Sequence, residues 1–189
     1  FGVFDRVAAA GEGPETTWML HALYEPAWNG TSEPDVSLPP DRQLVIDADG
    51  KGRLPNPRPG GRRLHAGGDT FTIDDRWPGM TGRLFAKILL PAEGERVVRT
   101  VGGAWHDFEV DGVNYGPTEA TYAKHGGGRN AHNRENTIGV EGWRIELSPR
   151  GAPAATTFLT VLVAADQASD RMPPVERIGG EGRPGARVT

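Results

Sequence analysis

Two apolar runs within residues 143–163 constrain the fold of this chain more than any other stretch. The first run alternates apolar and polar side chains, with Trp143, Ile145 and Leu147 against Arg144, Glu146 and Ser148. A period of two places the apolar set on one face of a strand. The second run, residues 158–163, is apolar almost throughout and rich in β-branched residues, as is typical of a central strand covered on both faces. The runs predict an antiparallel pair of strands joined by a long loop.

Further strands follow from the same alternation elsewhere in the chain. The predicted segments are residues 1–7, 17–24, 44–47, 69–74, 80–91 and 97–101. A two-residue turn, Asp111-Gly112, predicts a hairpin between residues 108–110 and 113–115. Residues 25–40 are expected to be a connection, and residues 53–68 a surface loop. The 27 glycines and 16 prolines suit many short strands joined by turns.

These segments together predict an all-β fold, an antiparallel two-layer β-sandwich with long loops rich in glycine and proline. The sandwich is expected to occupy residues 1–165. Residues 166–189 show no apolar period and are expected to form an irregular tail that is flexible or wraps the surface. A chain of 189 residues is long enough to bury a sizeable core.

Charge and composition exclude several classes of function. The formal net charge of -4 opposes a nucleic-acid-binding surface, which requires a basic excess. No apolar run reaches the length of a membrane span, so we expect neither a nucleic acid nor a membrane as partner. The absence of cysteine excludes disulfides and thiolate metal ligands. Phe1 begins an apolar run with no initiator Met, so we expect that the chain was cut or processed from a longer one.

Three segments, taken in order, are similar to part of a known family. They are VFDRV followed by WMLHALYEP, then RLFAKILLPAEGERVVRTVGGAWHDFEVDGVNY, then GWRIELSPRGAPAATTFLTVLVA. In this order they resemble the C-terminal β region of the heparinase II/III-like polysaccharide lyases. The resemblance covers roughly residues 3–165, although residues 25–68 and 116–139 have no counterpart.

The resemblance implies a parent lyase in which an α/α toroid precedes β-sandwich layers. Such enzymes cleave acidic polysaccharides, glycosaminoglycan or alginate, by β-elimination after removing the proton at C5 of a uronic acid. Their catalytic Tyr and His lie in the toroid and the first part of the β region, and no position here matches them, since Ala131-His132-Asn133 falls at the wrong place in the order. The implied role is therefore a non-catalytic support for the missing toroid, in a periplasmic or secreted parent.

The resemblance also bears on cofactors. It implies none in this chain, and a zinc or calcium ion would belong to the missing part of the parent. His125 and His132 lie seven positions apart with three glycines between them, which is not a metal-ligand spacing. Exposed loop histidines are therefore the favoured interpretation, and no metal site is predicted.

The candidate binding residues are aromatic, histidine and arginine side chains in and beside the long aperiodic segment 116–139. They are Trp105, His106, Tyr115, Tyr122, His125, Arg129 and His132. Aromatic faces can stack on sugar rings, and arginine suits a uronate carboxylate. His or Tyr could also take a proton in an elimination. We predict substrate binding, not catalysis, for this set.

Two other functions stay open at this point. The first is a stand-alone carbohydrate-binding module without catalysis, in which Trp28, Trp77 and Trp105 form an exposed platform. The second is a structural or interaction domain, which docks a sheet face on a partner segment.

Overall fold

The computed structural model confirms the all-β class. It describes residues 1–8, 16–37, 41–43, 45–46, 52–53, 57–58, 61–76, 79, 81–103, 106, 109–110, 113–114, 142–180 and 183–189. The regular elements in these ranges are β-strands and one 3-10 turn, η1 (Glu93–Glu95). None of the described residues forms a helix with the length and apolar character needed to span a bilayer.

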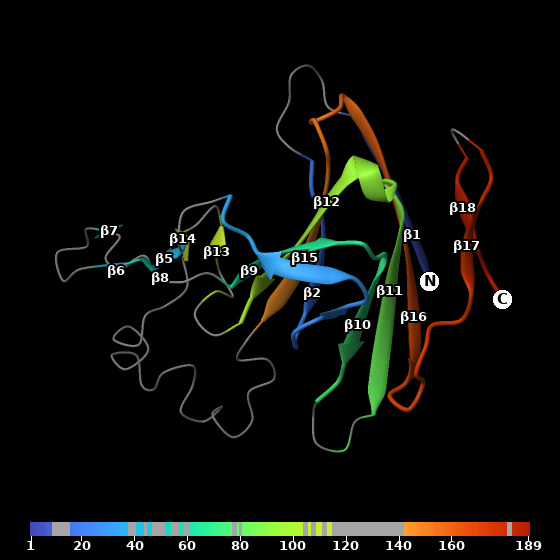
Figure 1. Ribbon diagram of the computed structural model, residues 1–189, viewed down its shortest axis with the longest axis horizontal. Helices are drawn as coiled ribbons and strands as arrows, with labels where there is room; N and C mark the ends of the chain where they lie inside the picture. Colours follow the sequence, from blue (N-terminus) through green and yellow to red (C-terminus); the bar gives the residue numbers. More distant parts are fainter. Residues whose placement is uncertain are drawn as a thin grey trace.

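Two five-stranded sheets form the sandwich (Figure 1). The first sheet has the order β1 (Gly2–Ala8), β16 (Ala155–Asp166), β11 (Gly82–Leu90), β10 (Thr70–Asp74) and β3 (Ala27–Trp28). The second has the order β2 (Trp18–Ala22), β15 (Trp143–Pro149), β12 (Arg96–Gly102), β9 (Arg62–Ala66) and β4 (Thr31–Pro34). Neighbouring strands in both sheets are antiparallel.

The core lies between the facing sides of the two sheets. Its buried side chains are Phe71, Ala86, Ile88, Val98, Ile145, Leu147 and Phe158. They alternate with outward-facing residues along their strands, as the period of two requires. Ile145 and Leu147 come from the first predicted run, and Phe158 comes from the second.

The predicted pairing of those two runs is wrong. β15 pairs with β12 and β2, whereas β16 pairs with β11 and β1, so the runs lie in opposite sheets. The short connection at residues 150–154 crosses between the layers, and the runs contact each other face to face in the core. Alternation fixes which face of a strand is buried, but it does not determine the neighbouring strand.

The prediction of an irregular tail is also wrong in part. β17 (Val175–Ile178) and β18 (Gly185–Val188) pair as an antiparallel hairpin. The hairpin contacts β11 and lies on the side of the first sheet that faces away from the second (Figure 1). Phe85, Leu159 and Val161, which point to this side, are at most 3% exposed. The sequence did not predict β17 and β18 because both strands are short and largely exposed. Their residues therefore show no alternation of apolar and polar side chains.

Four strands lie where a connection or a surface loop was predicted. β3 and β4 fall within residues 25–40, and β8 (Pro57–Arg58) and β9 fall within residues 53–68. β9 is an interior strand of the second sheet, paired with both β12 and β4. Its sequence, RRLHA, is mostly polar, so its place depends on backbone pairing and on specific polar contacts, not on an apolar face.

Short strands complete the described chain. β13 (Glu109–Val110) and β14 (Val113–Asn114) form the predicted hairpin, and β14 pairs with β5 (Asp41–Gln43), which pairs with β8 (Pro57–Arg58). β6 (Val45–Ile46) pairs with β7 (Gly52–Arg53), in agreement with the strand predicted at residues 44–47.

Candidate functional site

A hollow opens at the side of the sandwich where the edge strands β3 and β4 are short. Its volume is about 390 Å³, within the range of small-molecule sites. It is lined by Glu25, Pro26, Ala27, Trp28, Ser32, Arg63, His65, Arg76 and Thr100. We call it the Trp28 hollow. Another hollow, of about 450 Å³, is lined by Val97, Pro149, Arg150, Gly151 and Ala152, and contains no aromatic side chain.

The sheet register places Trp28 in the wall of this hollow. Trp28 lies opposite Phe71 across the β3–β10 pair, and the two ring centroids are 4.5 Å apart. The indole Nε1 donates a hydrogen bond to the carbonyl of Ala66 at 3.1 Å. Trp28 is thus fixed at both ends yet partly exposed, which leaves indole surface available to a ligand.

Two glycines make room for the indole. A Cβ on Gly30 would lie 2.2 Å from the carbonyl oxygen of Ala66 and 2.6 Å from Trp28 Nε1. A Cβ on Gly68 would lie 2.4 Å from Oδ1 of Asn29, whose side chain accepts hydrogen bonds from two backbone amides. Glycine at these positions allows the close approach of β3, β4 and β9 around the ring.

His65 lines the hollow, and both of its ring nitrogens contact hydroxyl groups. Ser32 lies directly opposite His65 in the β4–β9 pair, and its Oγ is 2.8 Å from Nδ1. The other ring nitrogen, Nε2, is 2.9 Å from Oγ1 of buried Thr100. Burial, and secondly the positive charge of Arg63, lower the pKa of His65 to about 4. The imidazole is therefore neutral at pH 7 and has both nitrogens engaged.

Two exposed arginines supply the positive charge. Arg63 lies in β9, and Arg76 lies just after the end of β10. The guanidinium carbon of Arg76 is 5.8 Å from the centre of the Tyr24 ring. Neither has an ion-pair partner among the residues that the structure describes. By contrast, other arginines are paired: Arg62 with Glu109, Arg83 with Asp74, Arg99 with Asp35, and Arg144 with Glu146. The charges of Arg63 and Arg76 are thus available to an anionic ligand.

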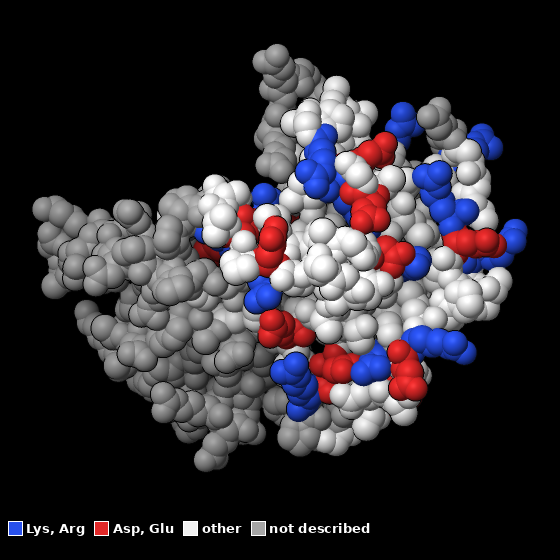
Figure 2. Space-filling view, in the orientation of Figure 1, with Lys and Arg blue, Asp and Glu red and all other residues white. Residues whose placement is uncertain are grey.

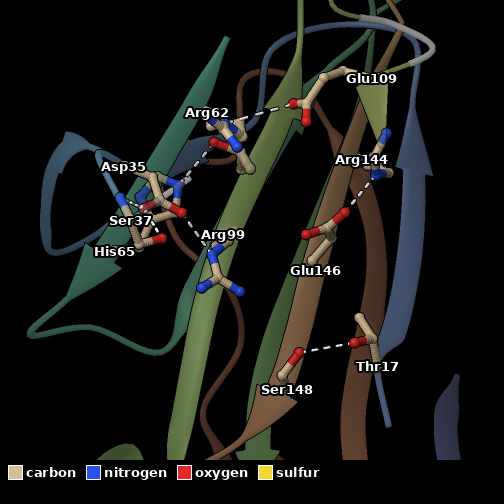
Figure 3. Close-up of polar contacts among 11 residues, drawn as sticks. Thr17, Asp35, Ser37, Arg62, His65, Arg99, Glu109, Arg144, Glu146 and Ser148 are labelled. Atoms are coloured by element: carbon tan, nitrogen blue, oxygen red, sulfur yellow. Dashed lines mark hydrogen bonds and ion pairs between the residues drawn. The ribbon is translucent and has the colours of Figure 1, made fainter. Parts of the chain in front are cut away.

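The paired arginines on the outer face of the second sheet have a structural role (Figure 3). The carboxylate of Asp35 accepts hydrogen bonds from Ser37 and from Arg99, the latter at 2.7 Å. Burial alone would raise the pKa of Asp35, but these hydrogen bonds hold the pKa below its ordinary value. Beside it, Arg62 and Glu109 form a buried ion pair, with 3.7 Å between Nε and Oε2. These groups attach the segments around β4 and β13 to the sheet.

The hollow therefore combines an aromatic surface, hydroxyl groups and two arginines that have no ion-pair partner in the described part of the chain. An indole ring can contact the C–H faces of a sugar, and guanidinium groups bind carboxylate or sulfate. Glu25 can accept hydrogen bonds from sugar hydroxyls. Proton transfer is a poorer match, because His65 has no free ring nitrogen.

Of the predicted binding residues, the structure describes His106 alone. His106 is 9% exposed and packs against Gly61, where an added Cβ would lie 2.7 Å from the histidine Cβ. It does not line the Trp28 hollow. Trp105, Tyr115, Tyr122, His125, Arg129 and His132 lie outside the described residues, so their grouping stays a prediction. Of the predicted tryptophan platform, Trp28 lines the hollow, and Trp77 and Trp105 also lie outside the described residues.

Sequence reasoning did not identify Arg63 and Arg76 as site residues. They are far from Trp28 in the chain, and the pairing of β3 with β10 and of β4 with β9 brings them together. The available signals were the adjacent arginines Arg62 and Arg63 and the position of Arg76 next to Trp77, and neither connects these residues with Trp28.

The described residues contain no group of three or more His, Asp or Glu side chains that could hold a metal ion. Comparison with known protein families finds no family model that matches this chain, and comparison with curated proteins finds no match.

Proposed function

We propose that this chain is the C-terminal β-sandwich portion of a heparinase II/III-like polysaccharide lyase, and that its Trp28 hollow binds the acidic polysaccharide. The observation that carries the binding role is the position of Arg63 and Arg76, two arginines without described ion-pair partners, beside the Trp28 indole. The family assignment depends on the resemblance of residues 3–165. The parent would be periplasmic or secreted, and its toroid would perform the elimination.

The two arginines favour an acidic over a neutral polysaccharide. A hydrogen bond to a charged group contributes about 1.5–3 kcal/mol, roughly twice a neutral one. The whole chain carries a net charge of -4, so its overall electrostatic field does not attract a polyanion. The attraction would come from the two arginines of the hollow. A neutral glucan would gain stacking on the indole but would leave both guanidinium groups without an anion.

A binding role also agrees with the state of His65. Its ring nitrogens contact Ser32 and Thr100, and its pKa near 4 makes it a weak base. The chain is therefore expected to bind substrate without turning it over. The same hollow favours the second candidate, a stand-alone carbohydrate-binding module, because its aromatic and charged lining needs no toroid.

Calorimetric titration with oligosaccharides of alginate, heparin and chondroitin tests the binding proposal. We expect one of these to bind, and the double variant Arg63→Gln/Arg76→Gln to lose about tenfold or more in affinity. Trp28→Phe should weaken binding less than Trp28→Ala, since phenylalanine keeps part of the stacking surface. Arg177→Gln, on the exposed strand β17, is the matched control and should bind like wild type.

Two results would overturn the proposal. One is the absence of binding to any of the three polysaccharides, and the other is equal binding by wild type and the double variant. The absorbance of unsaturated uronate product is the parallel readout for chemistry. We expect no rise with this chain alone, and a rise that the Arg177→Gln chain also produces would contradict the non-catalytic role.

A further inference from the structure

The Trp28 hollow lies between two other hollows at the open side and end of the sandwich. On one side lies the Arg150 hollow, about 330 Å³ in volume and lined by Trp28, His65, Ala66, Gly68, Glu93, Gly94, Arg96, Val98 and Arg150. On the other lies the Tyr24 hollow, about 340 Å³ in volume and lined by His21, Ala22, Leu23, Tyr24, Ile73, Asp74, Asp75, Gly82, Arg83 and Leu84.

The three hollows are adjacent through shared or consecutive residues. The Arg150 hollow and the Trp28 hollow have the side chains of Trp28 and His65 in common. The Tyr24 hollow meets the Trp28 hollow where Tyr24 is followed by Glu25, and where Asp75 is followed by Arg76. Arg76 also lies over the Tyr24 ring, so one side chain joins the two linings.

The flanking hollows differ from each other in charge. The Arg150 hollow has two arginines and one glutamate, the same balance as the Trp28 hollow, but the Arg96 guanidinium is already engaged with the carbonyls of Ile88, Pro91 and Gly68. The Tyr24 hollow has two aspartates and one arginine, and Arg83 is held by Asp74 through two hydrogen bonds. Leu23, which is 48% exposed, adds apolar surface there.

We propose that these hollows form one groove that binds an internal segment of an acidic polysaccharide, with a carboxylate or sulfate group in the Trp28 hollow and the neighbouring sugars in the flanking hollows. This inference rests on the proposed function. It adds that the bound polysaccharide extends beyond Trp28 on both sides. Binding affinity then depends on the length of the polysaccharide and not on recognition of its end.

Titration with di-, tetra- and hexasaccharides of the polysaccharide that binds best tests the groove. We expect affinity to rise with each added disaccharide up to the hexasaccharide. Arg150→Gln and Leu23→Ser, one in each flanking hollow, should each lower hexasaccharide affinity about fivefold, as the loss of about 1 kcal/mol of surface contact would. Both should leave disaccharide affinity unchanged. Arg177→Gln again serves as control.

The outcomes separate the groove from the proposed function. Equal affinity for the disaccharide and the hexasaccharide, with no effect of Arg150→Gln or Leu23→Ser, would overturn the groove and leave the Trp28 hollow as the site. Failure of every oligosaccharide to bind would overturn both. A hexasaccharide labelled at its reducing end should bind like the unlabelled one, and a loss of binding on labelling would show recognition of a chain end and contradict the groove.

Discussion

At the scale of single residues, His65 connects the sandwich to the hollow. Its ring contacts the Trp28 and Phe71 rings, at centroid distances of 5.6 and 5.3 Å, while its nitrogens are bonded to Ser32 and Thr100. A neutral imidazole fits this packing, whereas a charged one would bring a second cation close to Arg63.

This arrangement predicts a pH dependence of stability. The pKa of His65 is about 4 in the folded chain, below its ordinary value of 6.5, so the unfolded chain takes up the proton first as the pH falls. The stability that comes from neutral His65 is full above pH 6.5 and is lost as the pH falls towards 4. Urea unfolding at pH 7.5, 5.5 and 4.5 should show a smaller loss for His65→Gln than for wild type. Equal losses would contradict the assigned role.

Gly30 gives a second prediction at this scale. An added Cβ would meet the Ala66 carbonyl and Trp28 Nε1, and the backbone of a paired strand cannot easily yield. Gly30→Ala should therefore lower the free energy of unfolding by about 1–3 kcal/mol, as overpacking does. Gly94→Ala is the control, because nothing lies within 4 Å of its added Cβ. Equal free energies of unfolding for the two variants would show that Trp28 is not held as described.

The sequence predicted only part of the hollow. Trp28 was a candidate as an exposed aromatic residue, but Arg63 and Arg76 come close to it through strand pairing and not through a recognisable sequence motif. Period-two alternation predicts faces of strands. The lining of this hollow comes largely from the edge strands β3 and β4, from residues beside strand ends and from the mostly polar strand β9, where alternation gives little information.

At the scale of elements, alternation predicted the strands with strong apolar faces. β1, β2, β10, β11, β12, β15 and β16 all lie within or over predicted segments. It failed for β9, whose only large apolar residue is Leu64, and for β3 and β4, which are short and rich in polar residues. It also failed to place β15 and β16 in different sheets, because pairing depends on the connections between strands.

The attachment of the tail to the first sheet is testable through Arg83. Its guanidinium donates to both carboxylate oxygens of Asp74 and to the carbonyl of Ser169, at 2.6 to 2.9 Å. Arg83→Gln should lower the free energy of unfolding, because the variant loses both bonds to Asp74 and the bond to Ser169. Arg187→Gln removes an ion pair that is about 60% exposed on both sides, and should change stability by less than about 0.5 kcal/mol. A larger effect for Arg187→Gln than for Arg83→Gln would contradict this anchoring.

At the scale of the whole molecule, acidic and basic side chains alternate over the described part of the surface. On the face in Figure 2, the described residues show no broad field of one sign. A polyanion would therefore bind through a few contacts at the hollow, and its affinity should fall moderately with salt. Titrations from 50 to 300 mM NaCl should show this fall for wild type and a weaker one for Arg63→Gln/Arg76→Gln. Equal salt slopes would place the anion elsewhere.

The proposed function requires an acidic saccharide to bind against Trp28 and Arg63. The most direct measurement is an NMR titration that follows the five tryptophan indole signals and the His65 ring, with the Trp28 signal identified from Trp28→Phe. On addition of oligouronate, the Trp28 signal should move in a saturable way. The His65 ring signals should move together with it, because His65 lines the same hollow. Trp28 and His65 signals that stay unchanged at saturating ligand would contradict binding in the Trp28 hollow.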